Sequence, residues 1–234
     1  MQQSSKQDPG QRLARVAIFD FDGTVMDGQS GMLFSSYLLS RHMLPVRSVV
    51  GLVWWGFRYK LHLPYRQGEA RELVFRALAG RPAPEVDAIM ERFYEEVLAP
   101  RLRPKALAEI ARCHDEGLVC LLVSATFAPI AEAAAKATGM DGFVATKMER
   151  DARGNYTGEV DGNVVAGAEK YRAAERWCNE HLGPGAWELE RAYADHHTDE
   201  DLLARSQEAF AVCPGKTLRP VAKRNGWTIL DWGV

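Results

Sequence analysis

Two aspartates two positions apart are the strongest chemical signal in the sequence. Asp20 and Asp22 lie in the run Phe-Asp-Phe-Asp-Gly-Thr (19–24), after the apolar run Ala14–Phe19, which predicts a buried strand. Carboxylates just past a strand end project into the crevice at the carboxyl edge of a parallel sheet, where ligands bind. Such a pair can hold a hard divalent cation and leave one oxygen to attack phosphorus. The same residues also fit a polar turn.

Further polar residues follow in order along the chain. Ser124 ends a second apolar run, Lys170 lies at the opening of a predicted helix, and Asp195 and Asp199 follow another short strand. Taken singly, each has a structural explanation, such as helix capping by the serine or aspartate or a surface position for the lysine. Taken in order, they supply a nucleophile, a proton donor, positive charge for phosphoryl oxygens and metal-binding acids. Phosphoryl transfer needs that set.

The segments around these residues predict an α/β core, a Rossmann-like parallel sheet flanked by helices. After the first strand, we expect strands at 118–123, 143–146, 192–194 and 209–212 and helices at 104–116, 127–138, 169–182, 200–207 and 218–225. Residues Tyr156 to Val165, with glycines at 158 and 162, suggest a small hairpin flap.

Between the first strand and the rest of the sheet, the pattern is helical. Apolar periodicity predicts helices at 32–44, 46–63, 66–79 and 84–98. We therefore expect an inserted all-helical cap at 28–99, a core formed by 13–27 and 100–234, and a flexible polar leader at 1–12.

The composition narrows the class of protein. The 234 residues carry 29 Lys and Arg against 31 Asp and Glu, a net charge of −2, which argues against a nucleic-acid partner. The longest apolar run, Val49–Phe57, is far shorter than the about 20 residues that span a bilayer. Neither a signal-peptide pattern nor a Cys-x-x-Cys pair is present, so we expect a reducing, cytoplasmic location.

With these motifs, residues 16–227 resemble the haloacid dehalogenase superfamily of phosphatases, in the branch similar to phosphoserine phosphatase, whose helical cap follows the first motif. The resemblance implies that Asp20 attacks the phosphoryl group and forms an aspartyl-phosphate. Asp22 would protonate the leaving oxygen and then activate water. Mg²⁺ would be bound by Asp20, the Asp22 backbone carbonyl and Asp195, with support from Asp199.

The resemblance also implies a set of residues around the phosphoryl oxygens: Gly23, Thr24, Ser124, Ala125 and Lys170. A proton donor at position 22 favours phosphate esters as substrates, and therefore a phosphatase over a dehalogenase. A non-catalytic protein that binds a phosphorylated ligand on the same fold is the alternative of another class. The sequence departs from the family at His196, where a small residue is usual; His196 and the following His197 either reach the site or are solvated or packed.

The substrate is indicated less directly. Where phosphoserine phosphatases carry a glutamate that reads the substrate's amino group, this chain has Gln29, which favours another small phosphorylated metabolite or a phospholipid headgroup over phosphoserine. Phosphoserine phosphatase proper remains the alternative. The stretch 41–68 has basic and aromatic residues but no acid, with Trp54 and Arg58 as candidate substrate contacts. It fits a weak contact with an anionic membrane, an aromatic box for a choline-like group, or simply the core and wet face of the cap.

Overall fold

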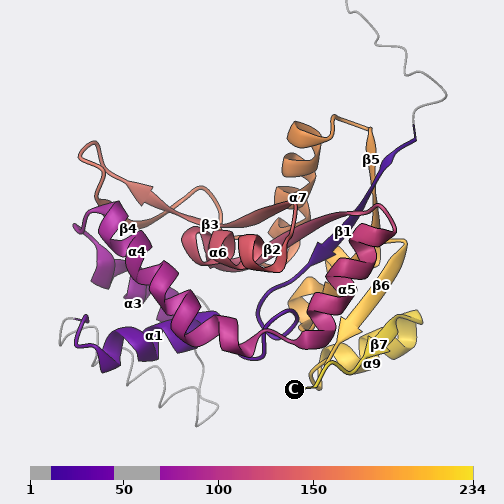
Figure 1. Cartoon of the computed structure of the whole chain (residues 1–234), viewed down its shortest axis with the longest axis horizontal. Coiled ribbons are helices and arrows are strands. Elements are labelled where there is room, and N and C mark those ends of the chain that lie inside the picture. Colours follow the sequence, from indigo (N-terminus) through magenta and orange to yellow (C-terminus); the bar gives the residue numbers. More distant parts are fainter. Residues whose placement is uncertain (1–11, 45–68, 234) are drawn as a thin grey trace, which may run out of the picture.

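The computed structural model describes residues 12–44 and 69–233, with the backbone alone at 69–73. Within them, a seven-stranded sheet has the order β4-β3-β2-β1-β5-β6-β7 (Figure 1). The strands are β1 (Ala14–Phe19), β2 (Val119–Phe127), β3 (Gly142–Arg150), β4 (Tyr156–Asp161), β5 (Trp187–Ala194), β6 (Glu208–Val212) and β7 (Thr228–Leu230). All neighbouring strands are parallel except β3 and β4. The predicted parallel α/β sheet is confirmed.

Helices cover both faces of the sheet. The side chains of β1 alternate: Ala17 and Phe19 join the core under α5 (Pro104–Asp115) and α6 (Ala128–Thr138). Val16 and Ile18 join the core on the other face. That face is covered by α7 (Ala168–His181), α8 (Glu200–Arg205) and α9 (Leu218–Asn225). Because both faces are buried there, Val16–Phe19 of β1 is a continuous apolar run.

The segment between β1 and β2 is helical wherever the structure describes it. It contains α1 (Ser30–Ser40), α3 (Glu69–Leu78) and α4 (Ala83–Phe93), which continues into a π-helical turn at Tyr94–Leu98. A short 3₁₀ turn at Ala99–Arg101 follows. These helices gather at one end of the molecule, with α3 against β4 (Figure 1). The helix expected at 46–63 lies outside the described residues.

The chain leaves and re-enters the sheet region along two adjacent segments. The Asp27 N–H donates to the Arg101 carbonyl at 2.9 Å, and the Arg103 N–H donates to the Val25 carbonyl at 2.9 Å. Arg103 is buried, and its guanidinium donates to Asp27 Oδ1 at 2.5 Å. The division into a core and a cap at 28–99 stays a prediction.

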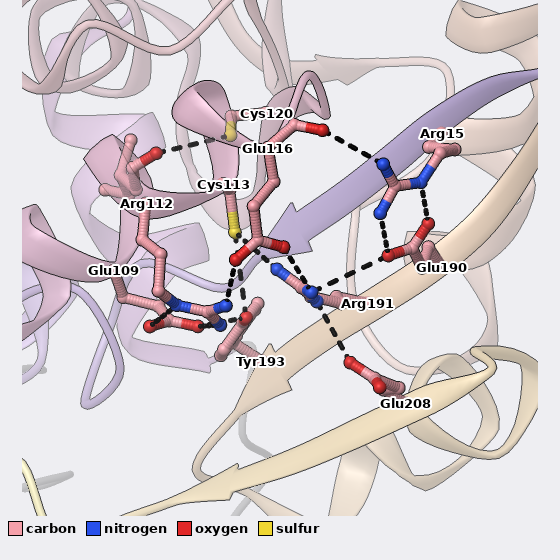
Figure 2. A network of polar contacts seen from close by, with 11 residues as sticks. Arg15, Glu109, Arg112, Cys113, Glu116, Cys120, Glu190, Arg191, Tyr193 and Glu208 are labelled. Atoms are coloured by element: carbon pink, nitrogen blue, oxygen red, sulfur yellow. Dashed lines mark hydrogen bonds and ion pairs between the residues drawn. The ribbon is translucent and has the colours of Figure 1, made fainter.

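A polar network connects the C-terminal end of α5 to the sheet (Figure 2). Arg191 on β5 is buried, and its guanidinium lies 2.6 Å from Glu116 Oε2 and 3.0 Å from Glu208 Oε2. Arg15 on β1 pairs with Glu190, the residue before Arg191 on β5. Since a buried guanidinium needs such partners, this network fixes the position of α5 relative to β5 and β6.

Two local predictions are wrong, and one strand was missed. Residues 156–165 do not form a hairpin of their own, because Tyr156–Asp161 pairs with β3 instead. The second strand was expected to stop before Ser124 but continues to Phe127, with an irregular register after Ser124. The three-residue strand β7 was not predicted, since it is too short to show a period. No helix in the described part of the chain has the length and apolar character to cross a bilayer.

Candidate active site

Three carboxylates meet at the carboxyl edge of the sheet. Asp20 follows β1 and Asp195 follows the adjacent β5, and the Asp20 N–H donates to the Tyr193 carbonyl at 2.9 Å. Asp199 closes a 3₁₀ turn, His197–Asp199, directly after β5. Each of the three acids offers an oxygen that lies within 4.8 Å of the other two. Adjacent parallel strands thus bring together acids that are far apart in sequence.

Lys170 joins this cluster from the first turn of α7. Its Nζ lies 2.7 Å from Asp20 Oδ1 and 2.9 Å from Asp199 Oδ2, and all three side chains are buried. The explanation of Lys170 as a surface residue is therefore wrong. Capping by Asp199 is wrong too, because its side chain makes no cap hydrogen bond and instead accepts from Lys170.

The cluster carries more negative than positive charge. Burial raises the pKa of Asp20 well above its ordinary value, against the attraction of Lys170, and raises the pKa of Asp195 to about 7. Burial alone would lower the pKa of Lys170, but Asp20 and Asp199 outweigh it and the pKa is raised. One ammonium therefore faces three carboxylates, and further positive charge would stabilise them.

The cluster fits a hard divalent cation. Asp199 Oδ1 is buried and finds no hydrogen-bond partner in the described part of the chain. Gly23 leaves space beside Asp195, since a Cβ at this glycine would lie 2.1 Å from Asp195 Oδ2. All the candidate ligand atoms are oxygens, which Mg²⁺ prefers.

Gly23→Ala should remove the response of the protein to Mg²⁺. Gly23 has φ +79°, so an alanine there costs about 1–2 kcal/mol of stability and its methyl group displaces Asp195. Gly117→Ala is the matched control, with φ +78° and nothing within 4 Å of the added Cβ. Thermal unfolding with and without Mg²⁺ measures both effects. Gly117→Ala should keep the Mg²⁺-induced rise in Tm, and a rise that survives in Gly23→Ala contradicts this account.

Asp22 has a different setting from the three clustered acids. Its Oδ1 accepts from the Ser30 N–H at 2.7 Å, and its Oδ2 accepts from the Ser30 hydroxyl at 2.9 Å. The Asp22 carboxylate thus lies at the N-terminus of α1, outside the cluster of Asp20, Asp195 and Asp199. Two neighbouring aspartates in the motif therefore have separate surroundings.

The predicted phosphate-binding residues after β1 and within β2 are largely buried. Ser124 Oγ accepts from the Thr126 N–H at 3.1 Å. The N-cap position of α6 is Phe127, so Ser124 is not the helix cap. The Ala125 carbonyl accepts from Thr146 Oγ1 at 3.1 Å. The hydroxyl of Thr24 is buried and has no hydrogen-bond partner among the described residues.

Thr146 is a buried residue that the sequence did not single out. Its hydroxyl donates to the Ala125 carbonyl and accepts from the Val165 N–H at 3.2 Å. It thereby connects the Ser124–Ala125 part of β2 to the segment that leads into α7. Ser30 and Thr126 were missed as well. Ser30, two positions before the expected helix at 32–44, was a signal for a helix start.

The remaining candidates lie around this site. Gln29 is exposed at the start of α1, without a capping hydrogen bond from its side chain. His196 Nδ1 lies 3.0 Å from Thr198 Oγ1, and the exposed His197 Nδ1 lies 3.2 Å from Thr217 Oγ1. Both histidines thus have local partners. Trp54 and Arg58 lie outside the described residues, but Arg41, at the start of the acid-free stretch, pairs with Glu96 at 2.5 Å.

Comparison with known proteins identifies the family of the chain. Residues 17–204 match the haloacid dehalogenase-like hydrolase family. The phosphoserine phosphatase SerB1 of Mycobacterium tuberculosis is 29% identical over 237 residues, which cover 98% of this chain and 75% of that protein.

Two solved structures share the fold. A Bordetella pertussis protein of unknown function has a TM-score of 0.82 at 26% identity, covering 94% of this chain and all of that one. A probable phosphoserine phosphatase of Vibrio cholerae has a TM-score of 0.65 at 15% identity, covering 94% of this chain and 61% of that one. Given the family match over most of the chain and the site described above, the chain belongs to the haloacid dehalogenase-like hydrolase family, as a phosphatase of its phosphoserine-phosphatase-like branch.

Proposed function

We propose that the protein is a Mg²⁺-dependent phosphomonoesterase that works through an aspartyl-phosphate. The observation that carries the proposal is the buried Lys170 in the first turn of α7, which bridges Asp20 at the end of β1 and Asp199 after β5. A lysine in that place neutralises part of the negative charge that an attacking carboxylate and a phosphoryl group bring together.

In the proposed reaction, Asp20 is the nucleophile. Lys170 holds Oδ1, so we assign the attack to Oδ2. A bond forms between Asp20 Oδ2 and phosphorus, and the bond between phosphorus and the leaving oxygen breaks. Asp22, protonated at this stage, gives the leaving oxygen its proton. Water then attacks phosphorus, Asp22 takes the water's proton, and the Asp20 carboxylate is restored with release of phosphate.

The other site residues would bind the phosphoryl oxygens and the metal. Because the Thr126 N–H already donates to Ser124 Oγ, the serine hydroxyl can turn its own proton to a phosphoryl oxygen. The proposed site also includes Gly23, Thr24 and Ala125. The N–H groups of Gly23 and Thr24 already donate within their turn, to the Met26 and Phe21 carbonyls at 2.9 and 3.3 Å. Mg²⁺ would be held by Asp20, Asp195 and the Asp22 carbonyl, with Asp199 in support, and would offset charge on the phosphoryl group.

For the substrate, we propose a small phosphomonoester or a phospholipid headgroup selected under a cap formed by 28–99. Gln29 is exposed at the start of α1, and its neutral amide cannot supply the charge that would recognise a substrate's ammonium group. Phosphoserine is the second candidate, because the relative SerB1 is named a phosphoserine phosphatase. A phosphate-release panel of phosphoserine, phosphocholine, phosphoethanolamine and phosphatidylglycerophosphate decides between them.

Hydrolysis of p-nitrophenyl phosphate should require Mg²⁺. We expect EDTA to reduce the rate to the background and added Mg²⁺ to restore it, because the three acids repel each other without a cation. The same titration should raise Tm. At a Mg²⁺ concentration a hundred times Kd, bound Mg²⁺ should add about 2.7 kcal/mol to the free energy of unfolding. Asp195→Asn should lose both responses, while Asp161→Asn, an exposed control, should keep them. Phosphate-ester binding without any Mg²⁺-dependent hydrolysis would favour the non-catalytic alternative.

A further inference from the structure

The Asp22 carboxylate accepts hydrogen bonds from Ser30, a residue of the segment between β1 and β2. Ser30 is the first residue of α1, and both its N–H and its hydroxyl reach Asp22, at 2.7 and 2.9 Å. Gln29, the residue before it, gives no side-chain cap, and the first turn of α1 contains no acid. Asp22 therefore takes the place of a helix cap, and α1 presents its first N–H group to the carboxylate.

The same serine connects Asp22 to β2. Ser30 Oγ lies 2.8 Å from Thr126 Oγ1, and the Thr126 N–H donates to Ser124 Oγ at 3.1 Å. A hydroxyl has one proton, so when Ser30 donates to Asp22 it accepts from Thr126. The result is a row of hydrogen bonds from Asp22 through Ser30 to the Thr126 hydroxyl, and the backbone N–H of the same threonine extends it to Ser124.

This row is well shielded from water. Ser30 is 1% exposed and Thr126 is 5% exposed. In such surroundings a hydroxyl that loses its partner is costly, so the row has one favoured arrangement. The direction of the Asp22 carboxylate is therefore set by groups on α1 and β2, in addition to its own turn.

We propose that Ser30 is a positioning residue for the proton donor: with Thr126, it aims the Asp22 carboxylate at the leaving oxygen and sets its place relative to Ser124. The inference rests on the proposed function, in which Asp22 protonates that oxygen. It also links the donor to α1, so that a shift of this helix moves the Asp22 carboxylate.

A misplaced proton donor has a recognisable effect. Proton donation matters most when the leaving oxygen is a strong base, and least when it departs as a stabilised anion. Phenyl phosphate and p-nitrophenyl phosphate have similar shapes but differ in this respect. The value of kcat/KM reports the steps up to departure of the leaving group, so the comparison isolates the first proton transfer.

The test measures kcat/KM for both esters in the Mg²⁺-loaded protein. For Ser30→Ala we expect a loss of about tenfold or more with phenyl phosphate and a several-fold smaller loss with p-nitrophenyl phosphate. Thr126→Val should show the same pattern of losses more weakly. Thr126→Ser, which keeps the hydroxyl, should have kcat/KM values close to those of the wild type for both esters. Ser35→Ala on the same helix is the control, because its hydroxyl donates only to the Gly31 carbonyl.

Equal losses with the two esters, or no loss in Ser30→Ala and Thr126→Val, overturn the inference. Thermal unfolding of each variant identifies any that is misfolded, and Thr126→Val then serves in place of Ser30→Ala. If the wild-type protein hydrolyses neither ester, the proposed function fails first. If it hydrolyses both and only the leaving-group pattern is absent, the positioning role alone fails.

Discussion

Asp20→Asn should abolish hydrolysis of p-nitrophenyl phosphate while the protein stays folded. We expect the rate to fall at least about 10³-fold, because the neutral amide cannot attack phosphorus and no aspartyl-phosphate forms. Burial and the neighbouring acids already raise the pKa of Asp20, so the folded protein without metal disfavours this charge. Its removal should therefore leave Tm unchanged or raise it.

The measurement is a rate with saturating Mg²⁺, together with thermal unfolding of the same variant without metal. Asp161→Asn makes the same chemical change at an exposed position and should keep the wild-type rate. Asp20→Asn with more than about a tenth of the wild-type rate contradicts the assignment of the nucleophile. A large fall in Tm would show instead that Asp20 is needed for folding.

Lys170→Met should reduce both activity and stability. Without the ammonium group, the negative charge on the attacking carboxylate and the phosphoryl oxygens is less well compensated, and we expect the rate to fall about 10²- to 10³-fold. Asp20 and Asp199 would then lie buried without their cation, at a cost of about 3 kcal/mol of unfolding free energy.

The stability effect has a defined pH range. The folded-state pKa of Lys170 is raised, so its contribution to stability is complete at neutral pH and is lost only as the pH rises through that raised value. Urea unfolding at neutral pH without metal measures this contribution. Lys136→Met, an exposed position on α6, is the control and should change neither the rate nor the midpoint. If Lys170→Met unfolds at the wild-type urea concentration, the buried ion pair does not stabilise the fold as described.

Much of the fold follows from local patterns in the sequence. The run Val16–Phe19 is apolar because both faces of β1 are buried there, and that pattern predicts a central parallel strand. The chain order of the acids and Lys170 relative to strands and helices predicts that they meet at one edge of the sheet. The hairpin expected at 156–165 was wrong because β4 pairs with β3, a contact that periodicity cannot reveal.

The sequence by itself determined the type of sheet, the positions of Asp20 and Asp195 at its carboxyl edge, and the chemistry that such residues allow. Only the tertiary structure decided which partner each side chain has. Lys170 reaches Asp20 and Asp199 rather than solvent, and Asp22 is held by Ser30 on α1. The physical reason is that strand and helix patterns are local, whereas these hydrogen bonds join side chains that meet only when distant elements pack together and exclude water.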